Sequence, residues 1–182
     1  MLKSLLVSLA LIFTAPLAIA GQGGSTAAEA LVSTAAEDIA ESEQDQVADA
    51  VLSHIDTRAI ANFTLGRYGR ALPAADKARF AAAFEDFLRR QIDANAHQFS
   101  GVDVDIIDTS ARNARDSIVT TELRTEQDRM KVRWRVIERG GKWSVVDLEI
   151  AGIWLAIEQR AQVSAILARP GADIEDVIAQ FG

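Results

Sequence analysis

The chain has no cysteine, and this absence excludes several classes of protein. Without thiols there can be no disulfide scaffold, no catalytic cysteine, no Cys-ligated zinc and no iron–sulfur cluster. Lipid anchoring through an N-terminal cysteine is excluded as well. Histidine is also scarce, because only His54 and His97 occur and neither belongs to an H-E-x-x-H pattern. We therefore expect no metal site.

Motifs for nucleotide binding and for serine hydrolysis are missing too. The sequence contains no G-x-S-x-G, no Walker A motif and no strand-led G-x-G-x-x-G. Asp103, Asp105 and Asp108 lack the glycine and distal glutamate of a calcium loop, and outward positions on an alternating strand explain them better. The net charge of −7 disfavours binding to nucleic acid or to an anionic bilayer. We expect no catalytic residues, no cofactor and no nucleic-acid partner.

The N-terminus has the pattern of a cleaved secretory signal. Lys3 supplies the positive charge, residues 5–13 the apolar region, and Ala18-Ile19-Ala20 the small-residue cleavage site. The apolar stretch is interrupted by Pro16 and is shorter than the ~20 residues that span a membrane. We expect residues 1–20 to be removed, residues 21–25 to form a flexible lead-in, and residues 26–182 to form one periplasmic domain.

Hydrophobic periodicity predicts helices first, then strands, then helices. The predicted helices cover residues 26–41, 44–56, 57–72 (with Thr57 as its cap) and 74–99. From Gly101 the period changes to two, and the predicted strands cover residues 102–106, 116–125, 129–138 and 142–150. Two more helices are predicted over residues 153–169 and 174–181. This order is typical of an α+β fold, here a curved antiparallel sheet with helices packed on one face.

Charge pairing predicts the alignment of the last two strands. A three-residue loop over 139–141 places Arg133 opposite Asp147 and collects the charged residues on one face, whereas a two-residue turn would scatter them. The charged face then carries a basic stripe that we expect to dock partner proteins: Lys131, Arg133 and Arg135. The alternative is that these side chains only pair with Asp147 and Glu149.

Several ordered segments resemble one known family. They are Leu65-Gly66-Arg67-Tyr68, Pro73 with the Phe80/Phe84 stripe, Trp143-Ser144-Val145-Val146-Asp147-Leu148, Gly152-Ile153 and Arg160-Ala161-Gln162. Together they resemble the MlaC family of periplasmic phospholipid-binding proteins, also called the toluene-tolerance family, over residues 48–181. The chain departs from the family where Trp154 replaces a common serine and Val163 a common phenylalanine.

The resemblance implies an NTF2-like α+β assembly that encloses an apolar cavity for acyl chains. It also implies a carrier of phospholipid between an outer-membrane lipoprotein complex and an inner-membrane ABC transporter with MCE domains. A hopanoid-like polycyclic lipid is an alternative cargo. From another class, an NTF2-like cavity enzyme would use Tyr68, His97 and Asp147 as its acid–base candidates.

Strand alternation and the helical stripe, rather than the family, select the residues that we expect to line the lipid cavity. They are Phe80, Phe84, Phe87, Leu88, Val104, Ile106, Trp134, Val136, Leu148, Ile153, Trp154 and Ile157.

Overall fold

A five-stranded antiparallel sheet organises the chain, and its strands lie side by side in sequence order. The computed structural model describes residues 22–98, 102–125 and 129–181. The strands are β1 (Asp103–Asn113), β2 (Asp116–Arg124), β3 (Arg129–Arg139), β4 (Lys142–Ile150) and the short β5 (Ile153–Trp154). The signal-peptide prediction concerns residues outside this range and stays a prediction.

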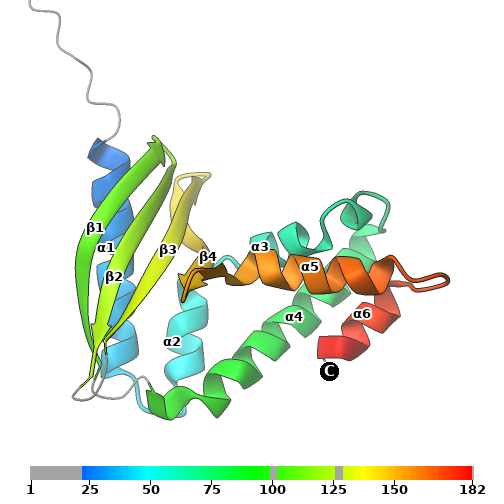
Figure 1. Ribbon diagram of the computed structural model, residues 1–182, viewed down its shortest axis with the longest axis horizontal. Coiled ribbons are helices and arrows are strands. Elements are labelled where there is room, and N and C mark those ends of the chain that lie inside the picture. The colour runs from blue at the N-terminus through cyan, green and yellow to red at the C-terminus, as the bar shows by residue number, and fades with distance from the viewer. Residues whose placement is uncertain (1–21, 99–101, 126–128, 182) are drawn as a thin grey trace, which may run out of the picture.

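Helices precede and follow the sheet. Before it come α1 (Gln22–Glu41), α2 (Val47–Ser53), α3 (Thr57–Leu65), the 3₁₀ turn η1 (Tyr68–Arg70), α4 (Ala74–Ala94) and η2 (Ala96–Gln98); after it come α5 (Leu155–Leu167) and α6 (Ile174–Phe181). Figure 1 shows α1 lying along the sheet, whereas α3, α4, α5 and α6 gather beyond β4. The expected α+β class with a curved antiparallel sheet is confirmed. No helix in the described part of the chain is long and apolar enough to cross a membrane.

The turn between β3 and β4 differs from the prediction. It has two residues, Gly140 and Gly141, both at positive φ (61° and 84°), so Arg139 pairs with Lys142. A β-bulge between Arg135 and Val136 then shifts the register, and Arg133 lies opposite Glu149 rather than Asp147. Because of this bulge, the charged residues lie on one face of the sheet and the apolar residues on the other, although the turn is short. The prediction did not include a bulge.

Several helix boundaries also differ from the prediction. Asp56, not Thr57, caps α3, because its Oδ1 accepts the backbone N–H of Ala59 at 2.9 Å. The helix ends at Leu65 because Gly66 takes φ 54° and ψ −129°, a conformation that favours glycine. At the N-terminus α1 begins at Gln22, so residues 22–25 are helical instead of a flexible lead-in.

The buried apolar residues form two clusters. The larger lies among α3, α4, α5 and α6, where Phe80, Phe84 and Phe181 meet with ring centroids 5.5–6.0 Å apart. The smaller lies between α1 and the sheet and includes Val32, Val119 and Val136. The molecule therefore has a helical half and a sheet half, each with its own core, which meet at β4.

Candidate functional site

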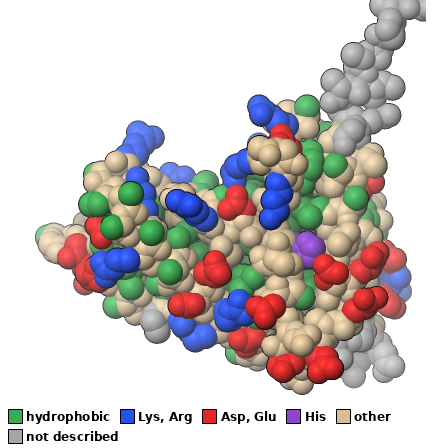
Figure 2. All heavy atoms as spheres, turned by 180° about the vertical axis from the view of Figure 1, so that it is seen from behind, with side chains coloured by type: hydrophobic (Ala, Val, Ile, Leu, Met, Phe, Trp, Pro, Cys, Tyr) green, Lys and Arg blue, Asp and Glu red, His purple; other side chains and the backbone are tan. Residues whose placement is uncertain are grey.

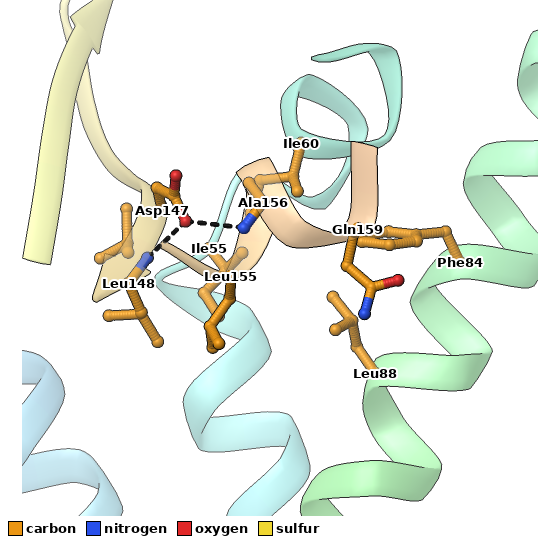
Figure 3. A pocket seen from close by; sticks show the side chains of 10 residues that line it. Ile55, Ile60, Phe84, Leu88, Asp147, Leu148, Leu155, Ala156 and Gln159 are labelled. Carbon is orange, nitrogen blue, oxygen red and sulfur yellow. Dashed lines mark hydrogen bonds between the residues drawn. The ribbon is translucent and has the colours of Figure 1, made fainter. Parts of the chain in front are cut away.

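An apolar pocket lies where the two halves meet, and we call it the β4 pocket. Its cavity volume is about 70 Å³. The residues that line it come from α3 and the turn before it, α4, β4 and α5: Ile55, Ile60, Phe84, Leu88, Val145, Asp147, Leu148, Leu155, Ala156 and Gln159. Figure 3 shows Leu148 and Leu155 on one side of the pocket and Phe84 and Leu88 of α4 on the other.

Asp147 fixes the start of α5 at this pocket. Its Oδ1 accepts the backbone N–H of Leu148 at 2.9 Å and that of Ala156 at 2.8 Å (Figure 3). The side chain is buried, with 7% of the residue exposed. Burial raises the pKa of the Asp147 carboxyl above its ordinary value, although the two N–H bonds and Arg135 favour the charged form. Asp147 thus holds β4 and α5 together.

Gln159 is the other polar side chain in the lining. It projects from the second turn of α5 toward α4, where Figure 3 shows its amide close to Leu88. Its Oε1 is buried and accepts no hydrogen bond from any residue that the structure describes. A buried polar atom without a partner is unusual in a native protein and requires an explanation.

A second apolar pocket, the α1 pocket, lies between α1 and the far end of the sheet. Its cavity volume is about 50 Å³, and its lining is Ala36, Ile39, Ala40, Val102, Val104, Leu123 and Trp134. The indole of Trp134 is anchored, because its Nε1–H donates to Thr121 Oγ1 at 2.9 Å. Both pockets are smaller than the roughly 300–1,000 Å³ of ordinary ligand sites.

The structure distributes the expected cavity residues over several places. Phe84, Leu88 and Leu148 line the β4 pocket, and Val104 and Trp134 line the α1 pocket. Phe80 and Phe87 belong to the helical core, and Val136 is buried beneath α1. Three residues are instead exposed, namely Ile106 at 38%, Ile153 at 53% and Ile157 at 54%. Trp154 pairs with Glu149 on the charged face, and the Arg133 guanidinium lies 5.4 Å from its ring centre.

Sequence reasoning missed most of the lining of the two pockets. Ala36, Ile39 and Ala40 have the i, i+3, i+4 spacing of one helical face, and this signal was available. Gln159 gave no signal, because a polar residue among charged neighbours on α5 is indistinguishable from a solvated one.

The outer face of the sheet carries the expected basic residues, and two of them have acidic partners. Arg133 Nη1 lies 2.6 Å from Glu149 Oε2, and Arg135 Nη2 lies 2.9 Å from Asp116 Oδ2. Lys131 is exposed. On the side of the molecule that Figure 2 shows, a notch opens between the two halves, and several Lys and Arg side chains lie along it. Docking by the basic stripe stays a prediction.

The three acid–base candidates are not assembled into one site. Asp147 lines the β4 pocket, His97 lines a depression beside α1 and α2, and Tyr68 lines another beside α6. The described residues contain no group of three or more His, Asp or Glu side chains that could hold a metal ion. The arrangement at the β4 pocket is suited to sheltering apolar groups.

The fold and its pockets define a small α+β protein with an apolar pocket between a sheet and a helical half. Residues 25–181 match the MlaC protein family, and the chain belongs to this family. Among solved structures, it is similar to a phospholipid-binding protein from Ralstonia solanacearum in complex with a phospholipid. The two are 15% identical with a TM-score of 0.73, over 87% of this chain and 94% of the other. No curated protein matches the sequence.

Proposed function

We propose that the protein is a phospholipid carrier that shelters acyl chains between its sheet and its helical half. The observation that carries this proposal is the β4 pocket, whose lining is apolar except for Asp147 and Gln159. Membership of the MlaC family supports it, as does the similarity to a structure that contains a phospholipid.

The energetics of lipid transfer suit such a site. Each buried CH₂ group is worth about 0.8 kcal/mol, so a ~16-carbon chain needs roughly 12 kcal/mol of shelter to cross water. A carrier must enclose the tails, whereas the headgroup can stay in contact with water. The two pockets have volumes of only about 70 and about 50 Å³, so the protein must open further to enclose a whole acyl tail.

The finer role that we propose is a periplasmic shuttle. In it the protein moves phospholipid between an outer-membrane lipoprotein complex and an inner-membrane ABC transporter with MCE domains. A negatively charged carrier would bind weakly to anionic membrane surfaces, so directed transfer would depend on those protein partners. We propose no catalytic activity, since the three acid–base candidates lie in three separate depressions.

Lipid content is the direct test. The protein is expressed with its leader, isolated from the periplasm and analysed by intact mass and by mass spectrometry of extracted lipids. We expect a chain beginning at Gly21 with a copurifying diacyl phospholipid, and uptake of labelled phospholipid from liposomes after delipidation. A folded protein that neither carries lipid nor takes it from liposomes would show the carrier proposal to be wrong. A hopanoid in the extract would instead identify a polycyclic lipid as the cargo.

A further inference from the structure

Two exposed arginines of the helical half are held against aromatic rings. The Arg160 guanidinium lies 5.0 Å from the centre of the Phe63 ring, and the Arg67 guanidinium lies 4.9 Å from that of the Tyr68 ring. Arg67 Nη2 also donates to Tyr68 Oη at 3.0 Å. Arg160 lies beside Gly66, the residue before Arg67, so the two arginines belong to one surface where α3 and α5 pack together (Figure 1).

Neither of these arginines forms an ion pair with a residue that the structure describes, although the chain has 26 acidic residues against 19 basic ones. Exposed arginines of α4 are paired instead, Arg79 with Glu175 at 2.6 Å and Arg89 with Asp49 at 2.7 Å. A guanidinium stacked on a ring keeps its N–H edge free for an anion such as phosphate, which it can bind through two parallel hydrogen bonds. The two stacked arginines are therefore positioned to bind phosphate groups.

Exposed apolar side chains border the two arginines. Phe63 is 38% exposed, and Ile157, one turn before Arg160 on α5, is 54% exposed. We call the surface formed by Phe63, Arg67, Ile157 and Arg160 the α3–α5 face. Basic side chains around exposed apolar ones are typical of surfaces that bind at the boundary between lipid headgroups and acyl chains.

We propose that the α3–α5 face docks the protein on an anionic phospholipid bilayer. In this arrangement Arg67 and Arg160 bind headgroup phosphates, and Phe63 and Ile157 contact the acyl boundary. The inference rests on the proposed carrier function, because the cargo of such a carrier resides in bilayers, and it adds the surface by which the chain meets one. The helix α5, which contributes to this face, also lines the β4 pocket.

The net charge of −7 makes this docking weak but also gives it a direction. A depression lined by Glu43, Asp45 and Asp93 lies at the α1–α2 connection and the end of α4. In Figure 1 these segments lie at the lower end of the molecule, whereas α3 and η1 lie at the upper end. A negative bilayer surface repels the acidic end and attracts the arginines, so the protein approaches it with the α3–α5 face toward the lipid.

Vesicle cosedimentation tests the proposal. Delipidated protein is incubated with vesicles of phosphatidylcholine, alone or mixed with phosphatidylglycerol, at low and at physiological salt. We expect wild type to bind the mixed vesicles, and to bind them less at the higher salt because exposed charges are screened. Arg67→Gln should bind them about fivefold more weakly at low salt. Arg89→Gln is the matched control, because it removes the same charge from an exposed arginine that already has an acidic partner, and it should bind like wild type.

Ile157→Gln tests the apolar part of the contact. It should weaken binding to the mixed vesicles about tenfold at both salt concentrations, because apolar burial is not screened by salt. Melting curves must show that each variant is folded, which the exposure of Arg67 and Ile157 favours.

The outcomes separate the docking surface from the carrier function. If wild type takes up labelled lipid but does not bind the mixed vesicles, or if Arg67→Gln binds them as well as wild type does, the inference is wrong and the carrier proposal stands. Binding that depends on Arg67 without lipid uptake would support the docking surface and contradict the carrier function. Unchanged vesicle binding by Arg67→Gln with lost association to the transporter's periplasmic domain would overturn the inference and assign the face to a protein partner.

Discussion

Trp134 on β3 and Leu148 on β4 are direct cross-strand partners, yet each lines a different apolar pocket. Opposed residues of an antiparallel pair point to the same face of the sheet. The α1 pocket and the β4 pocket therefore lie on one face, with this pair between them. Together the two pockets form the apolar surface along which we expect a lipid tail to lie.

Trp134→Glu should abolish most lipid loading. The substitution places a charge against the tails, and an unpaired charge in an enclosed apolar site costs several kcal/mol. Loading is measured by lipid extraction and mass spectrometry. Lys131→Glu, on the opposite face of the same strand, is the control and should load nearly as well as wild type. Circular dichroism and a melting curve must show that Trp134→Glu is folded, and full loading of this folded variant would contradict the pocket assignment.

Asp147→Asn should alter how stability depends on pH. Because the pKa of Asp147 is raised in the folded protein, the folded state retains a proton that the unfolded chain has released, and this group's contribution to stability falls as pH rises above about 4. An asparagine Oδ1 can still accept the N–H of Ala156 without carrying charge. The variant should therefore gain stability relative to wild type as pH rises above about 4, as measured by urea unfolding. A loss of stability that grows with pH would mean that the carboxylate is needed in its charged form.

Gly66→Ala should destabilise the fold by about 1–3 kcal/mol. Gly66 has positive φ, and a Cβ there would lie 2.9 Å from Arg160 Nε. The displaced guanidinium also lies 5.0 Å from the centre of the Phe63 ring, so that contact would be disturbed as well. Gly171→Ala is the control, since Gly171 also has positive φ but no atom within 4 Å of the added Cβ. Thermal or urea unfolding should show a smaller loss for the control; equal losses would mean that crowding by Arg160 contributes nothing.

A charge swap separates pairing from docking at Arg133. Arg133→Glu alone should cost up to about 1 kcal/mol by repelling Glu149, and adding Glu149→Arg should restore the pair and the stability. If the basic stripe docks a partner, the swapped protein should still associate more slowly with the transporter's periplasmic domain, most clearly at low salt. Association kinetics at two salt concentrations provide the measurement, and wild-type rates for the swapped protein would argue against docking through Arg133.

Local patterns were sufficient to predict most elements of the fold. The Phe80/Phe84 stripe identified α4, and the change of period at Gly101 identified the start of the strands. The register of β3 and β4 could not be derived from the sequence. The turn is one residue shorter than expected, and the bulge beside Val136 shifts the pairing by one further residue, so that the charged side chains still share one face. A bulge is set by packing across several strands, and charge pairing within one hairpin does not contain that information.

The candidate site was less predictable than the fold for a similar reason. The sequence predicts one helix over residues 153–169 that begins with the apolar Ile153 and Trp154. In the structure these two residues form the short strand β5 instead, and α5 begins only at Leu155. Ile153 and Ile157 consequently face solvent, and Trp154 lies on the charged side beneath Arg133. Which face of a helix or strand meets a pocket depends on how the two halves pack, and that is a tertiary property.

β1 forms one edge of the open sheet, with β2 as its only strand neighbour in the described sheet. An uncovered edge can recruit a strand from another chain. Asp103, Asp105 and Asp108 all lie on this strand. Asp105 pairs with Arg124 of the neighbouring strand. Because charged side chains on an edge strand disfavour pairing with a second copy, we expect this acidic run to limit edge-to-edge association.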